Sequence, residues 1–366
     1  MMNRTGYAYL PDYCVPPGWV LEEILESKNM KPAELARRCG CSRTHIHKVL
    51  NAKVAVEPET AIQFERVLGV KAIIWTNLES AYRLHLAKEK EREKFIRNVQ
   101  WAQRFPVKFL ISTGVLSKSI KPADTVIELL TFFGVGSVDA WERQFGSLNV
   151  AMRQSQVFQS NREAVLCWLR LGELQAMEAT CASFDSDAFK KTLHNIRSLT
   201  NEAGEVFAVR LRELCSAAGV LVVYVPPLPG MSLSGAARWL SSDKALIQLS
   251  LRHKTNDHFW FTFFHEAGHL LLNKKRMVFV DEEKDADNFA KDFLIPPNDW
   301  AEFVKNNRFS EEAIVGFANM QGIAPGIIVG RLQHEKLISY RWHNHLKEKL
   351  DWEKISVDSS PPGCID

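Results

Sequence analysis

Residues Trp260–Leu272 read WFTFFHEAGHLLL, an apolar segment that contains only three ionisable side chains, those of His265, Glu266 and His269. Its apolar residues recur at helical spacing around most of the circumference, which is typical of a buried helix. His265 and His269 are four residues apart, so both imidazoles leave one face of that helix and can bind a single metal ion. Glu266 lies beside that face, within reach of a water on the metal. The alternative is a core helix whose two histidines are satisfied by other partners.

The segment that follows supplies a third candidate ligand, which an open catalytic zinc site requires. Residues 283–294 read EKDADNFAKDFL and predict a second helix, which ends before the prolines at 296 and 297. Glu283 is the candidate third ligand of a Zn²⁺ ion, and Asp287, one turn later, can hold a ligand histidine by a hydrogen bond. Gly268 has no side chain, so we expect a strand or a substrate to pass close to it.

The composition is that of an ordinary globular protein, with 366 residues, a net charge of +3 and no apolar run long enough to span a bilayer. Seven scattered cysteines without a CxxC pair, and the lack of a signal-peptide pattern, predict reduced thiols, a cytoplasmic location and no membrane partner. Residues 1–105 carry 17 Lys and Arg against 12 Asp and Glu, whereas the remainder carries 29 against 31. The basic N-terminal part hints at a nucleic-acid-binding module.

Short helices separated by glycines are predicted in the N-terminal region. They cover residues 19–25, a stretch from Pro32 to Gly40, a stretch from Ser42, residues 57–68, and a fifth stretch from Ala72. Two short helices joined by a tight glycine turn form a helix-turn-helix arrangement, in which the third helix reads a DNA major groove. The alternative is a small bundle with a solvated polar face. The candidate DNA-binding residues of the third helix are Ser42, Arg43, Thr44, His45, His47, Lys48 and Asn51.

Residues 36–84, ARRCGCSRTHIHKVLNAKVAVEPETAIQFERVLGVKAIIWTNLESAYRL, resemble the helix-turn-helix of the Xre superfamily, and most closely its HigA-like antitoxin branch. The resemblance covers about residues 15–86. One departure is Asn51-Ala52-Lys53, where the family usually has Asn-Gly-Lys, and we expect the helices to remain intact. The resemblance implies a homodimer that binds an inverted-repeat operator in double-stranded DNA, with half-sites about one helical turn apart.

The rest of the chain predicts an α+β fold in several parts. Residues 1–86 form the helix-turn-helix domain and residues 87–185 a helical connector to which we assign no chemistry. Residues 186–350 form a zincin-like domain with a small sheet and the HExxH helix, and residues 351–366 a flexible tail. The predicted strands cover residues 219–225, 236–240 and 245–249, the last two as a hairpin. Leu246–Ser250 is the expected edge strand, which can hold an extended peptide by backbone pairing.

Several motifs of this domain resemble the ImmA/IrrE-type metallopeptidases. They are VVYVPPLPG, LIQLS, FTFFHEAGHLLLN, EKDADNFAKDFLIP and GIAPGIIVGRLQHEKLI, the last at residues 322–338. The resemblance covers about residues 186–350 and implies zinc on His265, His269 and Glu283, with Glu266 as the catalytic residue. Asn273 stands where members of the family often have a histidine.

These features predict a transcriptional regulator with a fused zinc-dependent endopeptidase that cleaves a partner protein, such as a toxin, or itself to control repression. Zinc would lower the pKa of water, and Glu266 would take the proton and return it to the leaving amine. The alternative function is a non-catalytic, antitoxin-like repressor whose C-terminal domain binds a toxin or senses a ligand. A third class is a peptidase whose helical bundle binds only protein. The candidate donors to the oxyanion, which we leave unranked, are His253, His258, Arg331, His334 and Tyr340.

Overall fold

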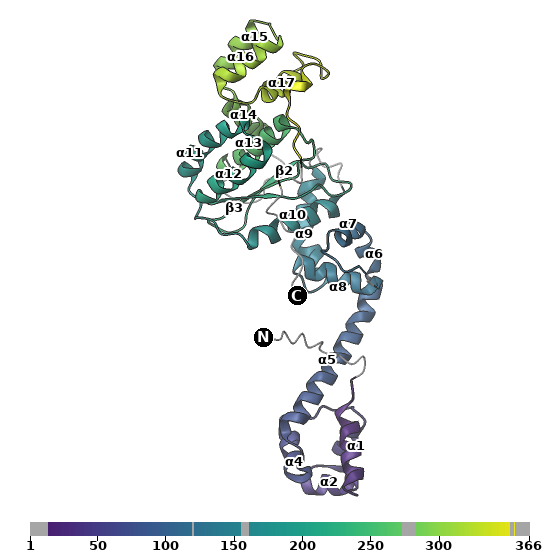
Figure 1. Ribbon diagram of the computed structural model, residues 1–366. Coiled ribbons are helices and arrows are strands. Elements are labelled where there is room, and N and C mark those ends of the chain that lie inside the picture. Colours follow the sequence, from purple (N-terminus) through teal and green to yellow (C-terminus); the bar gives the residue numbers. More distant parts are fainter. Residues whose placement is uncertain (1–13, 119–120, 155–160, 273–282, 352–354, 356–366) are drawn as a thin grey trace, which may run out of the picture. The chain divides into compact units, whose positions relative to one another are not determined.

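The computed structural model describes residues 14–118, 121–154, 161–272, 283–351 and 355. The chain forms two compact units, Met1–Arg97 and Asn98–Asp366. It is mostly helical and contains one three-stranded sheet (Figure 1). In the described parts of the chain, no single helix is long and apolar enough to cross a membrane. The helices Glu311–Gln321 and Pro325–His334 meet that length and composition only as a pair, and the pair is bent by 114°.

The described part of the N-terminal unit is a helical bundle. Prolines in the first turns of three of its helices preset the helical backbone, and Gly40 and Gly69, both with left-handed backbones, end two of them. The bundle closes around Phe64 and Trp75, whose rings lie 5.3 Å apart. The helices are α1 (Pro17–Ser27), α2 (Pro32–Cys39), α3 (Arg43–Leu50), α4 (Pro58–Leu68) and α5 (Ala72–Arg97).

Two local features of this unit bear on the sequence-based expectations. Helix α5 runs without a break past residue 86, where we placed the end of the first domain, and stops at Arg97. The turn after α3 places Ala52 at a φ of 55°, the left-handed region that favours glycine. The helices before and after this turn are intact, as expected for the departure from Asn-Gly-Lys.

The C-terminal unit begins with helices that form their own aromatic cluster. Trp101, Phe105, Phe133 and Trp141 pack edge to face or tilted, with ring centroids 4.7 to 5.7 Å apart. These residues come from the segment that we expected to be a helical connector. The helices are α6 (Val99–Ala102), α7 (Val107–Ser112), α8 (Pro122–Phe133), α9 (Val138–Gln154) and α10 (Arg162–Met177).

The remaining helices surround the sheet or extend from it. They are α11 (Ser186–Ser198), α12 (Gly204–Ala217), α13 (Asn256–Leu272), α14 (Glu283–Leu294), α15 (Pro297–Lys305), α16 (Glu311–Gln321) and α17 (Pro325–His334), with 3-10 turns at Leu199–Asn201 and Asn344–Leu346. Near the C-terminus, Ile355 is buried and its carbonyl accepts a hydrogen bond from Arg212 of α12. The rest of the expected flexible tail after Asp351, and Asn273, lie outside the described residues.

The sheet has the order β1-β3-β2. Strand β1 (Val220–Tyr224) runs parallel to β3 (Ala245–Leu249), and β2 (Gly235–Trp239) runs antiparallel to β3. The predicted hairpin is therefore present, but the expectation that Leu246–Ser250 forms an edge strand is wrong. β3 is the central strand because both of its sides are paired, and every one of its residues is buried. Of the described strands, β2 is the edge strand that lies next to α13.

Helices cover both faces of the sheet (Figure 1). Helices α12 and α13 pack on one face, where Trp260 and Phe263 lie in the main core. Helix α10 packs on the other face, where the Trp168 indole donates to the carbonyl of Val225 at 2.9 Å. The buried Gln248 of β3 donates to the carbonyl of Trp168 at 2.6 Å. Helix α10, which the sequence suggested was part of a connector, is thus the cover of the second sheet face.

Candidate metal centre and nucleic-acid interface

Helices α13 and α14 carry all of the candidate metal ligands and lie in direct contact. A Cβ atom added to Gly268 would lie 3.0 Å from the ring of Phe289. A close approach at Gly268 is therefore made by the neighbouring helix α14. This close packing brings the first turn of α14 alongside the two histidines of α13.

The three candidate ligands converge on one point. The Nε2 atoms of His265 and His269 lie 3.1 Å apart. The Glu283 carboxylate lies 3.1 Å from Nε2 of His265 and 3.9 Å from Nε2 of His269. One ligand atom from each residue lies within 4.8 Å of the others, and these are groups that could hold a metal ion.

The donor set and its spacing fit a zinc ion. Zinc binds histidine nitrogen and carboxylate oxygen at ~2.0–2.2 Å in tetrahedral sites, so neighbouring ligand atoms lie about 3.3 Å apart. The separations between His265, His269 and Glu283 are close to this value. Three protein ligands leave one position for water or substrate, as in catalytic rather than structural zinc sites.

The Asp287 carboxylate orients His265 from the far side of its ring. Its Oδ1 lies 2.9 Å from Nδ1 of His265, so the ring donates its Nδ1 proton there and its Nε2 faces the shared point. Burial by itself would lower the pKa of His265, but the hydrogen bonds with Asp287 and Glu283 outweigh it and raise the pKa to about 10. Hydrogen bonding to His265 in turn lowers the pKa of Glu283. The pocket thus favours positive charge at this point.

The Glu266 carboxyl is buried beside the ligand cluster. Burial raises its pKa to about 7, aided by the negative charge of Glu283 and opposed by His265 and by a hydrogen bond from the backbone N–H of Ala237. A Cβ atom added to Gly235 would lie 2.8 Å from the Glu266 carboxylate and 2.6 Å from the methyl group of Thr262. Strand β2 therefore passes directly over the catalytic candidate, and only glycine fits at position 235.

Among the described strands, none pairs with the outer edge of β2. Ser250 donates to Ser234 and Leu240 donates to Lys244 across the β2–β3 pair. Because antiparallel hydrogen bonds alternate, the backbone groups of Ala237 and Trp239 point away from β3. The sequence placed this role on β3, because residue alternation does not reveal the lateral order of strands.

The candidate oxyanion donors are not gathered at the cluster. Arg331 donates to Glu335 and to the carbonyls of Lys291 and Ile295, and it lies over the Trp300 ring at 4.4 Å. The rings of His253 and His258 are stacked with centroids 4.2 Å apart. Four of the candidates line a cavity on α13, α14 and α17: His258, Arg331, His334 and Tyr340.

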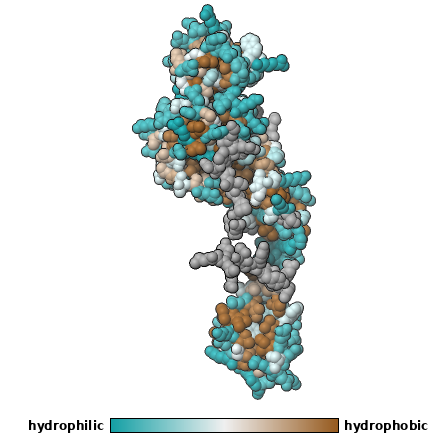
Figure 2. All heavy atoms as spheres, viewed as in Figure 1, coloured by the Kyte–Doolittle hydropathy of each residue, from teal (hydrophilic) through white to brown (hydrophobic). Residues whose placement is uncertain are grey.

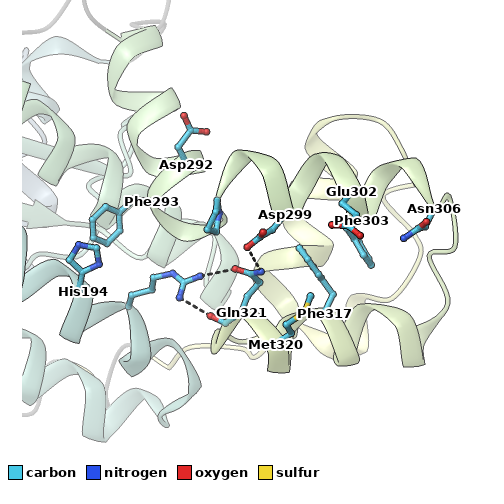
Figure 3. Close-up of a pocket in the computed structure, with 12 residues that line it drawn as sticks. His194, Asp292, Phe293, Asp299, Glu302, Phe303, Asn306, Phe317, Met320 and Gln321 are labelled. Carbon is cyan, nitrogen blue, oxygen red and sulfur yellow. Dashed lines mark hydrogen bonds between the residues drawn. The ribbon is translucent and has the colours of Figure 1, made fainter.

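A larger groove of about 660 Å³ lies between α11, α14, α15 and α16 (Figure 3). Its rim carries the carboxylates of Asp292, Asp299 and Glu302, and its floor is aromatic. None of its lining residues is a candidate metal ligand. Cavity size therefore does not locate the metal centre in this protein.

The helix-turn-helix surface is formed by α2, the Gly40 turn and α3. The Ser42 side chain caps α3 by accepting from the backbone N–H of His45 at 3.1 Å. Ile46 and Val49 are buried against the other helices of the bundle. The Asn51 amide donates to the carbonyl of His47 at 2.7 Å. The exposed candidate DNA-binding residues are Ser42, Arg43, Thr44, His47, Lys48 and Asn51, whereas His45 is half-buried.

Comparisons with known proteins identify this unit. Residues 21–75 match the family described as Helix-turn-helix. The Escherichia coli protein described as "Uncharacterized HTH-type transcriptional regulator YddM" is 32% identical over 68 residues, which are 19% of this chain and 72% of that protein. Through this segment, the chain belongs to the helix-turn-helix family. It is a DNA-binding helix-turn-helix regulator, and residues 21–75 include α2 and α3.

Solved structures of helix-turn-helix proteins are also similar over about a fifth of the chain. One is a putative antidote protein of a plasmid maintenance system from Nostoc punctiforme (26% identity, 23% of this chain, 92% of that chain, TM-score 0.23). Another is an addiction module antidote protein of the HigA family from Coxiella burnetii (25%, 23%, 91%, 0.21). A third is PA4674 from Pseudomonas aeruginosa in complex with its operator DNA (29%, 20%, 82%, 0.20).

Proposed function

We propose that this helix-turn-helix regulator carries a zinc-dependent endopeptidase in its C-terminal unit, in a zincin-like fold. The observation that supports this most is the convergence of His265, His269 and Glu283 beside the buried Glu266. The motifs that resemble ImmA/IrrE-type metallopeptidases contain all four residues. A small sheet with its edge strand next to the HExxH helix fits the same plan.

In the proposed reaction, the three ligands hold zinc and Asp287 keeps His265 in the tautomer that can bind it. Zinc, when bound, acts as a Lewis acid that lowers the pKa of water and polarises a peptide carbonyl. Glu266 takes a proton from the attacking water and returns it to the nitrogen of the leaving amine. Its pKa of about 7 suits both transfers at neutral pH, and its hydrogen bond from Ala237 fixes the carboxylate in place.

The substrate of the proposed endopeptidase is an extended protein segment. The outer edge of β2 can pair with such a segment through the carbonyl of Ala237 and the backbone groups of Trp239, since the Ala237 N–H donates to Glu266. Backbone pairing would lay the segment along α13, beside Glu266. The segment belongs either to a partner protein, such as a toxin, or to the chain itself, and its cleavage would relieve repression.

The N-terminal unit is proposed to bind an inverted-repeat operator as a homodimer. Helix α3 presents Arg43, His47 and Lys48 to solvent for contacts with bases and phosphates. Hydrophobic side chains gather on the visible face of this unit (Figure 2). Ile73, Ile74 and Leu84 are exposed apolar residues on one side of α5, and we propose that they contact a second copy. The operator complex of PA4674 supports the proposed DNA partner.

Metal analysis combined with a cleavage assay tests the peptidase. Zinc content and cleavage, both of the chain itself and of a peptide library read by mass spectrometry, are measured for the wild type and for Glu266→Gln and His265→Ala. Glu266→Gln should keep one zinc ion per chain and lose cleavage, because it removes only the proton carrier. His265→Ala should lose the zinc. Glu312→Gln, an exposed substitution on α16, is the matched control.

The possible outcomes separate the functions. Cleavage by the Glu266→Gln variant at the wild-type rate would refute the proposed mechanism. Stoichiometric zinc without cleavage in the wild type would instead support the non-catalytic, antitoxin-like repressor. Loss of zinc in the Glu312→Gln control would show that the assay reports misfolding.

DNA binding is tested by fluorescence anisotropy with operator candidates from the chain's own promoter at several salt concentrations. Affinity should fall steeply with salt, since phosphate contacts release counterions. Lys48→Met should weaken binding and reduce the salt slope by about one. Lys88→Met, on the solvated part of α5, should leave the slope unchanged. A slope near zero for the wild type would favour a bundle that binds only protein.

A further inference from the structure

A second cavity, of about 190 Å³, lies between α13, α14, α17 and the segment that follows α17. Its lining combines apolar residues with three cationic side chains, two histidines and a single acidic group. The apolar lining consists of Phe261, Leu294, Ile295 and Ile327. The polar lining includes Asp257, His258, Lys291, Arg331, Gln333, His334 and Lys347.

Most of the charged groups of this cavity are already paired. Asp257 is buried and forms an ion pair with Lys347 at 2.6 Å. The Arg331 guanidinium donates hydrogen bonds to the Glu335 carboxylate and to two backbone carbonyls. Lys291 has no ion-pair partner within 4.0 Å among the described residues. Lys291, whose charge also acts on the Asp287 carboxylate one turn earlier, is therefore the lining cation that is not held in a close ion pair.

The polar wall is held rigidly. The Gln333 side chain is only 2% exposed, accepts from Lys347 at 2.8 Å and donates to the carbonyl of Trp342 at 2.9 Å. It also contacts Asn344 at 3.0 Å, so one buried amide fixes the segment that closes the cavity. A preformed site of this kind binds without first having to order its wall.

We propose that this cavity binds a small monocarboxylate with a short apolar body. The carboxylate pairs with the Lys291 ammonium, and the apolar body lies against Phe261, Leu294 and Ile327. The volume corresponds to about six water molecules and is below the ~300–1,000 Å³ of pockets for drug-sized ligands, so the ligand is a small free acid rather than a peptide. The groove of Figure 3 has the opposite character, because its rim is acidic.

The cavity lies one helical turn from the candidate metal centre on both helices that form it. Phe261 precedes His265 by four residues, with ring centroids 6.2 Å apart, and Lys291 follows Asp287 by four residues on α14. A bound acid would therefore contact both α13 and α14. The proposal goes beyond the peptidase and does not depend on it, because binding can be measured on the full chain whatever its metal content.

The test uses three probes of one size: hexanoate, hexan-1-ol and hexylammonium. Binding to the full-length chain is measured by saturation-transfer NMR and isothermal titration calorimetry. Hexanoate should bind at least tenfold more tightly than either other probe, because only it can pair with Lys291. Lys291→Met should weaken hexanoate binding about tenfold and leave hexan-1-ol binding unchanged. Lys305→Met, the same change at an exposed position of α15, is the matched control.

A second variant tests the apolar side of the cavity. Ile327→Phe adds bulk to the apolar side and should weaken hexanoate and hexan-1-ol binding alike, with circular dichroism confirming that the chain is folded. Equal affinity for hexanoate and hexan-1-ol, or equal effects of Lys291→Met and Lys305→Met, would overturn the carboxylate assignment. Undiminished hexanoate binding by a folded Ile327→Phe variant would place the ligand elsewhere and overturn the site.

Discussion

Both ring nitrogens of His265 have close polar partners. Its Nδ1 faces Asp287 at 2.9 Å, and its Nε2 faces His269 and Glu283, each at 3.1 Å. A ring fixed at both nitrogens cannot rotate away from the ligand position. The Asp287 carboxylate therefore positions the candidate ligand His265 from the side of the ring that faces away from the proposed metal site.

Replacing this positioning carboxylate should weaken metal binding without unfolding the chain. Asp287→Asn keeps the shape of the side chain but removes the charge that makes His265 a stronger ligand. We expect zinc affinity to fall about 10–100-fold, measured by competition with a chromophoric chelator. Asp285→Asn, two residues earlier on the exposed face of α14, should bind zinc like the wild type. Equal affinities for both variants would mean that Asp287 does not orient the ligand.

Ala52 has a backbone conformation that is unfavourable for a residue with a side chain. Its φ of 55° lies in the left-handed region, which costs an L-residue roughly 1 kcal/mol relative to glycine. Ala52→Gly should therefore stabilise the N-terminal unit by about 1 kcal/mol, measured by urea denaturation. Ala55→Gly, at a position without a positive φ, should be neutral or destabilising. A loss of stability in Ala52→Gly would show that the turn does not hold this conformation in solution.

At the scale of elements, the contact between β2 and α13 decides the surroundings of Glu266. The strand passes so close that Gly235 has no space for a methyl group beside Glu266 and Thr262. Gly235 is thus the point of closest approach between β2 and α13. The strand covers the Glu266 carboxylate and donates a hydrogen bond to it from the backbone N–H of Ala237.

Adding a single methyl group at this contact should separate the strand from the helix. Gly235→Ala is expected to cost ~1–3 kcal/mol of stability through overpacking and to lower cleavage by displacing Glu266. Thermal unfolding and the cleavage assay check the two effects. Gly316→Ala on α16, where an added Cβ would meet no atom within 4 Å, should be neutral or stabilising. If Gly235→Ala behaved like this control, the close strand would have no role at the site.

At the scale of the whole molecule, the sheet is completed by a helix from far upstream. Trp168 and Gln248 join α10 to β1 and β3 by two buried hydrogen bonds, and the buried Arg238 of β2 donates to the carbonyl of Leu169. The zincin-like domain predicted to begin at residue 186 would lack helix α10, which covers one face of the sheet. Its sheet would expose one apolar face to water.

Fragment boundaries should reflect this dependence. A fragment of residues 98–366, which is the whole C-terminal unit, should unfold cooperatively and sediment as a defined species. A fragment of residues 186–366 should aggregate or melt without cooperativity, because the α10 face of the sheet is bare. Circular dichroism melts and analytical ultracentrifugation compare the two. Equal stability of the fragments would show that α10 is dispensable.

Features that depend on residues close together in the sequence were predictable. Proline at helix starts, glycine at helix ends and the Ser42 cap predicted the bounds of α2 and α4 and the start of α3 to within a residue or two. The four-residue spacing of His265 and His269 predicted a shared face, and the structure places them there together with Glu283. Their roles as zinc ligands stay a prediction, as do the four-part domain division and the DNA contacts of α3.

Features that depend on distant parts of the chain were not predictable in this way. Nothing in the pattern of Ala245–Leu249 distinguishes a central strand from an edge strand, because both can be apolar on both faces. The polar residues Arg238 and Gln248 are buried, and each donates a hydrogen bond to a backbone carbonyl of α10. No local signal pairs either residue with α10.

The sequence by itself determined the helix-turn-helix and the side chains able to hold one ion, since both follow from spacing within a single element or two adjacent ones. Only the tertiary structure decided that β2 rather than β3 lies over Glu266, and that α10 closes the sheet. The reason is physical: helical periodicity and capping act over a few residues, whereas lateral strand order and face coverage are settled by how much apolar surface the whole unit can bury.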